Sequence, residues 1–90
     1  MKKAIISVIG KDMVGIIAKV CTYLSGAGAN IEDISQTILQ GYFTMMMVVD
    51  LSNSGKGFDE VSRELEKIGE EMGLVIKMQH EDIFNTMHRI

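Results

Sequence analysis

Two near-continuous apolar segments constrain this chain more than any other feature. The first is Ala4-Ile5-Ile6-Ser7-Val8-Ile9, and the second is Tyr42-Phe43-Thr44-Met45-Met46-Met47-Val48-Val49. Both are short, are rich in residues that favour strands, and are apolar at odd and even positions alike. A strand with that composition is buried on both faces, so we expect both segments to lie in the middle of a sheet.

Two other segments have the period of an amphipathic helix. The first begins after Asp12 and ends near Gly28, with one apolar stripe predicted from Ile17, Val20, Cys21 and Leu24. The second is closed by Gly73, and its apolar residues recur at steps of three and four: Phe58, Val61, Leu65, Ile68 and Met72. The charged residues of the second segment fall on its other face and are expected to be solvated.

Two further strands complete the pattern. Residues 31–39 alternate with polar groups on both faces, which is typical of an edge strand, and Gln40-Gly41 joins this strand to the next by a tight turn. Residues 74–78 form the last strand. The order strand, helix, strand, strand, helix, strand predicts an α+β fold of the ferredoxin-like βαββαβ type, with a four-stranded antiparallel sheet and two helices on one face. The first and third strands are expected in the centre.

The length of 90 residues fits one domain, 1–90, with a core of about 3–79 and a C-terminal tail of 80–90. The tail has apolar residues at Ile83, Phe84, Met87 and Ile90, a pattern that suits a short helix docked on the domain or on a partner. The formal net charge is only -3, with no basic patch, so a direct nucleic-acid partner is not expected.

The single cysteine, Cys21, cannot form an internal disulfide, which fits a reducing compartment. Because Cys21 falls within the apolar stripe, it is expected to be a small core residue and not a nucleophile. No apolar segment approaches the length that spans a membrane, and the N-terminus is too short for a signal-peptide core. We therefore expect a cytoplasmic protein with no membrane partner.

The turn after the first strand reads Ile9-Gly10-Lys11-Asp12-Met13-Val14-Gly15. Gly10 allows the chain to turn, and Asp12 is suited to cap the helix start. Gly15, with no Cβ, lets the first helical turn approach another backbone or a ligand closely. The first-turn amides have no intrahelical acceptor and carry partial positive charge, so a carboxylate could bind there. The same residues could equally serve only to make the turn, and neither a P-loop nor a dinucleotide-binding glycine motif is present.

Residues 9–18 and 28–36 resemble the ACT-domain family of small-molecule-binding regulatory modules. The hairpin residues 42–45 and the ending 83–90 are similar to the stand-alone, glycine cleavage system repressor-like ACT family. The resemblance covers essentially the whole chain. It implies a homodimer paired through sheet edges or helices, with an effector amino acid bound at the interface, acting on a separate partner because no other domain is attached.

The resemblance also implies a set of ligand-binding residues. They are Gly10, Lys11, Asp12, Met13, Val14 and Gly15 in the turn, and Asn30 and Ile31 at the start of the second strand. Asp12 is the candidate partner for an α-amino group, and the amides of residues 13–15 are candidates for the carboxylate. Asn30 could line the site or simply begin its strand.

Three alternatives remain open at this stage. A purely structural or protein-interaction domain would have the same sequence pattern with no ligand. A metal-binding protein would use His80, Glu81, Asp82 and His88, although their spacing is lax and no paired metal motif is present. An enzyme is not expected, because no catalytic set can be assembled and the first loop has no arginine. Neither a cofactor nor a resident metal is expected.

Overall fold

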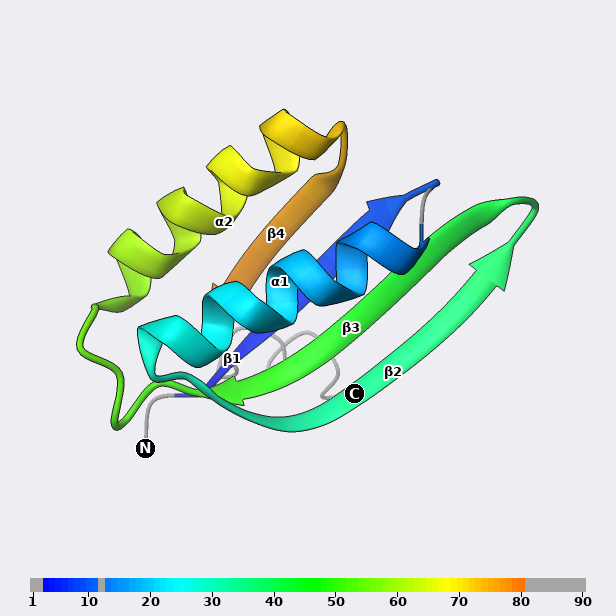
Figure 1. The fold of residues 1–90 in the computed structure, drawn as a ribbon. Coiled ribbons are helices and arrows are strands. Elements are labelled where there is room, and N and C mark those ends of the chain that lie inside the picture. Colours follow the sequence, from blue (N-terminus) through cyan, green and yellow to red (C-terminus); the bar gives the residue numbers. More distant parts are fainter. Residues whose placement is uncertain (1–2, 12, 81–90) are drawn as a thin grey trace.

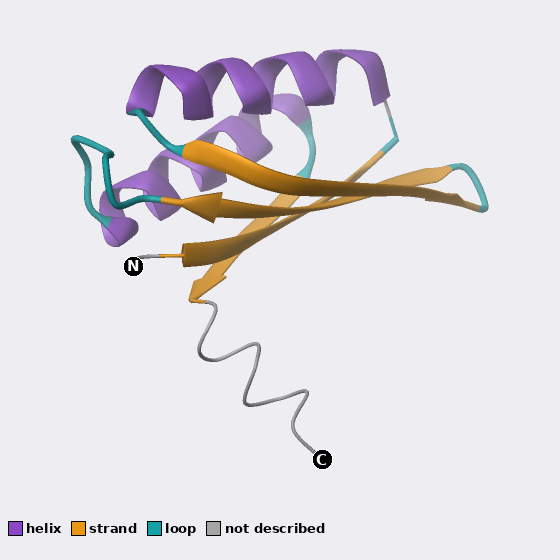
Figure 2. Ribbon diagram, turned by 90° about the horizontal axis from the view of Figure 1, so that it is seen from below, coloured by secondary structure: helices purple, strands orange, loops and turns teal. Residues whose placement is uncertain are grey.

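The computed structural model describes residues 3–11 and 13–80. The elements follow in the order β1 (Lys3–Gly10), α1 (Met13–Ala27), β2 (Asn30–Leu39), β3 (Tyr42–Asp50), α2 (Phe58–Met72) and β4 (Val75–His80). The strands form one antiparallel sheet in the order β2-β3-β1-β4, and both helices cover the same face of it (Figures 1 and 2). The predicted ferredoxin-like βαββαβ fold is confirmed, with β1 and β3 in the centre.

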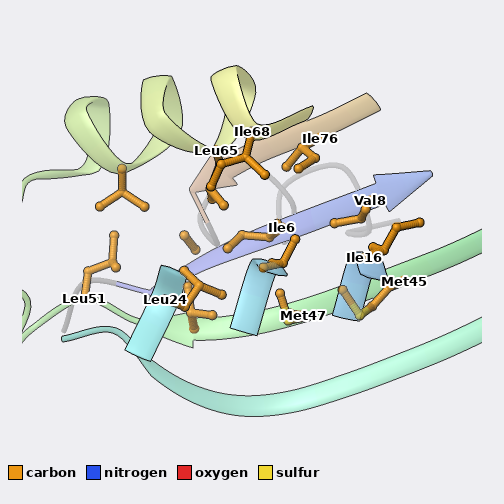
Figure 3. Packing of buried hydrophobic residues seen from close by; sticks show 14 of the residues in the cluster. Ile6, Val8, Ile16, Leu24, Met45, Met47, Leu51, Leu65, Ile68 and Ile76 are labelled. Atoms are coloured by element: carbon orange, nitrogen blue, oxygen red, sulfur yellow. The ribbon is translucent and has the colours of Figure 1, made fainter. Parts of the chain in front are cut away.

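The core lies between the two central strands and the helices (Figure 3). Alternate residues of β1 and β3 point into it and are at most 2% exposed: Ala4, Ile6, Val8, Phe43, Met45, Met47 and Val49. Two of the three consecutive methionines are therefore core residues, and Met46 lies on the opposite face of the sheet. Burial of these apolar side chains is the main source of stability for the sheet.

The helices bury unequal stripes. In α2 the buried apolar residues are Val61, Leu65 and Ile68, as the sequence period predicts. In α1 the buried line consists of Ile16, Val20, Leu24 and Ala27, whereas Ile17 and Cys21 are only half-buried. The stripe predicted for α1 was therefore wrong: the buried stripe is rotated about the helix axis relative to it. Cys21 lies at the margin of the core.

Left-handed backbone conformations mark three turns. Gly28 ends α1 with φ 81°, and Gln40 and Gly41 join β2 to β3 with φ 51° and 82°. Gly73 ends α2 with φ 72°, and the next amide, that of Leu74, donates to the Gly69 carbonyl oxygen at 2.7 Å. This bond satisfies one of the carbonyls that a helix end leaves without an intrahelical donor.

Strand β2 forms one edge of the sheet and carries a bulge. The register with β3 shifts between Ile31 and Asp33, so Glu32 is the extra residue, and its carboxylate pairs with Lys3 Nζ at 3.0 Å. Beyond the bulge, Ile34, Gln36 and Ile38 lie on the helix side, in the predicted alternation. No helix within residues 3–11 and 13–80 is long and apolar enough to cross a lipid bilayer.

Candidate functional site

A hollow of about 420 Å³ opens where β1 ends and α1 begins. Figure 1 shows that this end of the sheet also holds the turn between α2 and β4 and the hairpin between β2 and β3. The hollow combines a mostly apolar wall with the residues of the β1–α1 turn. Its lining residues are Ile9, Gly10, Lys11, Ile16, Tyr42, Met72, Gly73, Leu74 and Val75.

Gly10 is a packing residue, and the turn does not depend on its conformational freedom. It is the last residue of β1 and is buried, and among the glycines in the described residues only Gly28, Gly41 and Gly73 have positive φ. A Cβ at Gly10 would overlap the Leu74 side chain and lie 3.0 Å from Ile16 Cδ1. The interpretation of Gly10 as a residue that permits the turn is corrected: its missing side chain leaves space for Leu74.

Lys11 places a positive charge at the rim of the hollow. Its side chain is exposed, and its Nζ lies 5.6 Å from the centroid of the Tyr42 ring. Such a cation–π contact holds an ammonium group near an apolar surface. Tyr42 was missing from the sequence-based set. It could have been found from topology, because in an antiparallel pair the start of β3 meets the end of β1, as Gly10 and Phe43 do here.

Helix α1 begins at Met13, immediately beside the hollow, and its first turn includes Val14 and Gly15. The amides of a first turn have no acceptor within the helix and carry partial positive charge. Asp12 lies outside the described residues. At Gly15 an added Cβ would lie 3.6 Å from Met72 Cε, which is an ordinary van der Waals contact. The packing of this protomer therefore does not require glycine at position 15.

Asn30 and Ile31 lie at the opposite end of the sheet. Asn30 pairs with Asp50 on β3, whereas Gly10 pairs with Phe43 on the same strand. Seven residues of β-strand separate these two positions by about 23 Å. Asn30 is exposed, and Ile31 is half-buried against the core. One protomer thus brings Gly10, Lys11 and the start of α1 together but leaves Asn30 and Ile31 remote from them.

A separate polar cluster links the two helices to the loop before α2. The Glu64 carboxylate accepts hydrogen bonds from the Tyr23 hydroxyl and from Lys56 Nζ, the latter at 2.7 Å. Burial, followed by the Glu64 hydrogen bond, raises the pKa of Tyr23. The hydrogen bond from Lys56, followed by that from Tyr23, lowers the pKa of Glu64. The two donors, Tyr23 and Lys56, share the Glu64 carboxylate as their acceptor. The cluster is therefore a structural link between α1 and α2.

The residues of the metal alternative are only partly described. The His80 ring stacks on Phe58 of α2, with centroids 3.8 Å apart and an interplanar angle of 12°. Glu81, Asp82 and His88 lie outside the described residues. Within the described part of the chain, no three His, Cys, Asp or Glu side chains are grouped so that they could hold a metal ion.

The fold and the position of the hollow match a known class of protein. A family model described as the ACT domain matches residues 2–79, so this chain belongs to the ACT-domain family of regulatory modules. More particularly, the chain is similar to a UPF0237 protein of Bifidobacterium longum strain NCC 2705. The two are 56% identical over 90 residues, the full length of both chains.

Solved structures agree with this assignment. An ACT domain protein from Streptococcus pneumoniae is 44% identical, with a TM-score of 0.81 over 92% of this chain and 93% of that one. A candidate glycine cleavage system transcriptional repressor is 26% identical, with a TM-score of 0.74 over 88% of this chain and 45% of that one. The predicted resemblance to the ACT family, including its repressor-like members, is confirmed.

Proposed function

We propose that this chain is a homodimeric sensor that binds an amino acid or a similar small polar ligand and controls a separate partner without catalysis. The observation that carries the proposal is the hollow at the β1–α1 turn. There an apolar wall lies beside Lys11 and the first turn of α1. One site therefore offers contacts for the carboxylate of an amino acid and for its apolar side chain.

Each part of an amino acid has a chemical counterpart in this region. The ligand carboxylate is suited to the first-turn amides of α1 and to the Lys11 ammonium at the rim. The α-amino group is assigned to the carboxylate of Asp12. An apolar ligand side chain is suited to the wall formed by Ile9, Leu74 and Val75.

Exposed apolar residues support pairing through the β2 edge. On this strand Ile38 is 61% exposed and Leu39 is 68% exposed, which is unusual for an edge strand facing water. If two β2 strands pair antiparallel, the start of one lies beside the end of the other. Asn30 and Ile31 of a second protomer would then lie at the end of the sheet that holds the hollow of the first, and the two remote parts of the predicted site would complement each other.

A thermal-shift screen against the twenty amino acids and several divalent metals tests the proposal. A ligand that binds only the folded state raises Tm, by an amount that grows with its concentration over Kd. We expect stabilisation by one or a few amino acids and its loss in Asp12→Asn, with the Tm of the unliganded variant unchanged. A response that survives in Asp12→Asn would remove Asp12 from the site.

The alternative is a protein-interaction domain without a ligand, and the exposed β2 residues favour it as well, because they need only a partner. The two functions differ in the screen. A dimer that responds to no amino acid would support the interaction domain, and a response to a metal alone would move attention to His80 and the residues that follow it.

A further inference from the structure

Three exposed apolar side chains gather at the end of the sheet that holds the hollow of the β1–α1 turn. Ile9 is 44% exposed, Tyr42 is 49% exposed and Val75 is 53% exposed, and all three line the hollow. They come from three neighbouring strands, since Ile9 of β1 pairs with Val75 of β4 and with Thr44 of β3, two residues from Tyr42. A group of exposed apolar side chains of this kind marks a binding surface.

The rest of the apolar wall borders the core. Ile16 at the start of α1 is fully buried, and Met72 and Leu74, at the turn from α2 to β4, are partly buried against the core. An apolar group that enters the hollow is therefore removed from water on more than one side. The volume of about 420 Å³ is well above the roughly 150 Å³ that accepts a benzene ring, so a long side chain fits.

The charge of the lining is one-sided. Lys11 is the only charged residue among the lining residues that the structure describes, and its Nζ lies 5.6 Å from the centroid of the Tyr42 ring. A ligand carboxylate is attracted to this ammonium group. A cationic side chain on the ligand would be repelled by it and would meet no carboxylate on the described part of the wall.

We infer that the ligand class of this site is α-amino acids with a long, uncharged, apolar side chain, and that Ile9 and Val75 set this selectivity. The inference rests on the function proposed above and narrows it. With the ligand carboxylate beside Lys11, the ligand side chain lies along Ile9 and Val75, two neighbours in one cross-strand pair.

The hydrophobic effect decides between small and large ligands here. Glycine or serine would leave the exposed Ile9 and Val75 side chains in water, so these amino acids gain nothing from the wall. Each methylene group that the wall covers increases the affinity by about fourfold. Selectivity therefore grows with the length of the side chain, whereas the contacts of the carboxylate and the α-amino group stay the same.

A series of amino acids that differ only in chain length tests the inference. The series is alanine, α-aminobutyrate, norvaline and norleucine, and thermal-shift titration of the full chain gives Kd for each. We expect Kd to fall by about fourfold at each step. Binding with one Kd across the series, or best binding of alanine, would overturn the inference and leave the proposed function standing. No binding by this series or by any of the twenty amino acids would overturn both.

A charged analogue tests the role of Val75. Lysine has the side-chain length of norleucine with an added ammonium group, and the wild type should bind it at least about tenfold more weakly. Val75→Asp places a carboxylate in the wall and should remove or invert this preference. Gln79→Asp adds the same charge to the same strand outside the hollow and should keep it.

Two outcomes of this comparison would overturn the assignment of Val75. One is an unchanged preference in Val75→Asp, and the other is an equal loss in Gln79→Asp. Val75 is half-exposed at the start of an edge strand, so the variant should fold. If it does not, Val75→Thr keeps the shape of the side chain and adds a hydroxyl group, and it should weaken the binding of norleucine but not of alanine. Equal effects on the two ligands would overturn the assignment.

Discussion

Helices α1 and α2 each have 15 residues and cover the same face of the sheet, but their outward faces differ in charge. The outward face of α2 carries acidic and basic residues along its whole length and is exposed to solvent. In α1 the only charged residue is Lys19. A helix end or face that remains in water gains from charged residues, whereas a face that packs against protein is small or apolar. This difference is the one expected if α1, unlike α2, packs against a second protomer.

The position of the uncharged face indicates where such a protomer would bind. At about 100° per residue, Lys19 falls on the same side of α1 as Tyr23, which bonds to Glu64 on α2. The opposite side contains Ile17 and Cys21, and it faces β2, because β2 lies at the sheet edge away from α2 and β4. Ala18 and Ser25 lie next to it on the outward face of α1. The uncharged side of α1 thus continues the exposed apolar surface of β2, where we propose that the second protomer binds.

The largest expected effect is on the dissociation constant of the dimer, and it comes from adding a charge to the uncharged surface of α1. Ala18→Glu gives α1 a charge on its outward face beside the β2 side, and a dimer that covers this position would bury one such charge from each protomer. We expect the dissociation constant of the dimer to rise at least ~100-fold, since an unpaired buried charge costs about 3–5 kcal/mol. Sedimentation equilibrium measures this constant.

The control is Lys67→Glu, which adds negative charge to the exposed face of α2 and should leave the dissociation constant unchanged. The folded monomer of Ala18→Glu should keep its stability within about 0.5 kcal/mol, because the position is exposed. If both variants dimerise as the wild type does, the uncharged side of α1 has no part in pairing.

The second effect concerns Gly69, a glycine of α2 that lies close to the start of β4. A Cβ at Gly69 would lie 3.0 Å from the Leu74 carbonyl oxygen and 3.3 Å from Ile76 Cγ1. The backbone has little room to move, because the Gly69 carbonyl itself accepts the amide of Leu74 at 2.7 Å. We expect Gly69→Ala to lower the free energy of unfolding by about 1–3 kcal/mol, measured by urea unfolding. An unchanged or higher stability would show that α2 can shift away from β4.

A smaller effect tests the link between the helices. The pKa of Glu64 is lowered in the folded state, chiefly by the hydrogen bond from Lys56, so its contribution to stability is present above the unfolded pKa of about 4.3. That contribution is lost as the pH falls through the folded pKa. We expect Tm of the wild type to fall more steeply below about pH 4.3 than Tm of Glu64→Gln. Glu66→Gln, at an exposed position of α2, should retain the wild-type steepness.

The sheet could be predicted from the sequence because its central strands are apolar at nearly every position and its edge strand alternates. The rotation of α1 could not, since Ile16, Ile17, Val20, Cys21 and Leu24 allow two neighbouring stripes with the same period. Only the sheet beneath the helix selects between them. The bulge at Glu32 was also missed, because a single inserted polar residue leaves the alternation on either side intact.

The candidate site was predicted less completely than the fold. The turn residues Gly10 and Lys11, two of those predicted from the sequence to bind a ligand, line the hollow, but most of the wall comes from β4, the end of α2 and the start of β3. Sequence spacing cannot place Leu74 against Gly10. The pairing of β4 with β1 does place it there, so knowledge of the strand order is needed first. The inclusion of Asn30 and Ile31 came from the family resemblance. Because they lie remote from Gly10 within one protomer, they can share a site with it only in the dimer that we propose.

The smallest expected effect comes from Gly15→Ala, which should change the free energy of unfolding and the ligand affinity in opposite directions. Gly15 is in α1, and a Cβ there would make only an ordinary contact with Met72, in contrast to the crowding at Gly69. Glycine within a helix costs about 0.5–1 kcal/mol relative to alanine, so Gly15→Ala should raise the free energy of unfolding by that amount. Because Gly15 adjoins the proposed ligand site, we expect the same variant to bind the amino acid more weakly, measured by calorimetry. Higher stability with unchanged affinity would mean that neither packing nor ligand binding requires glycine at this position.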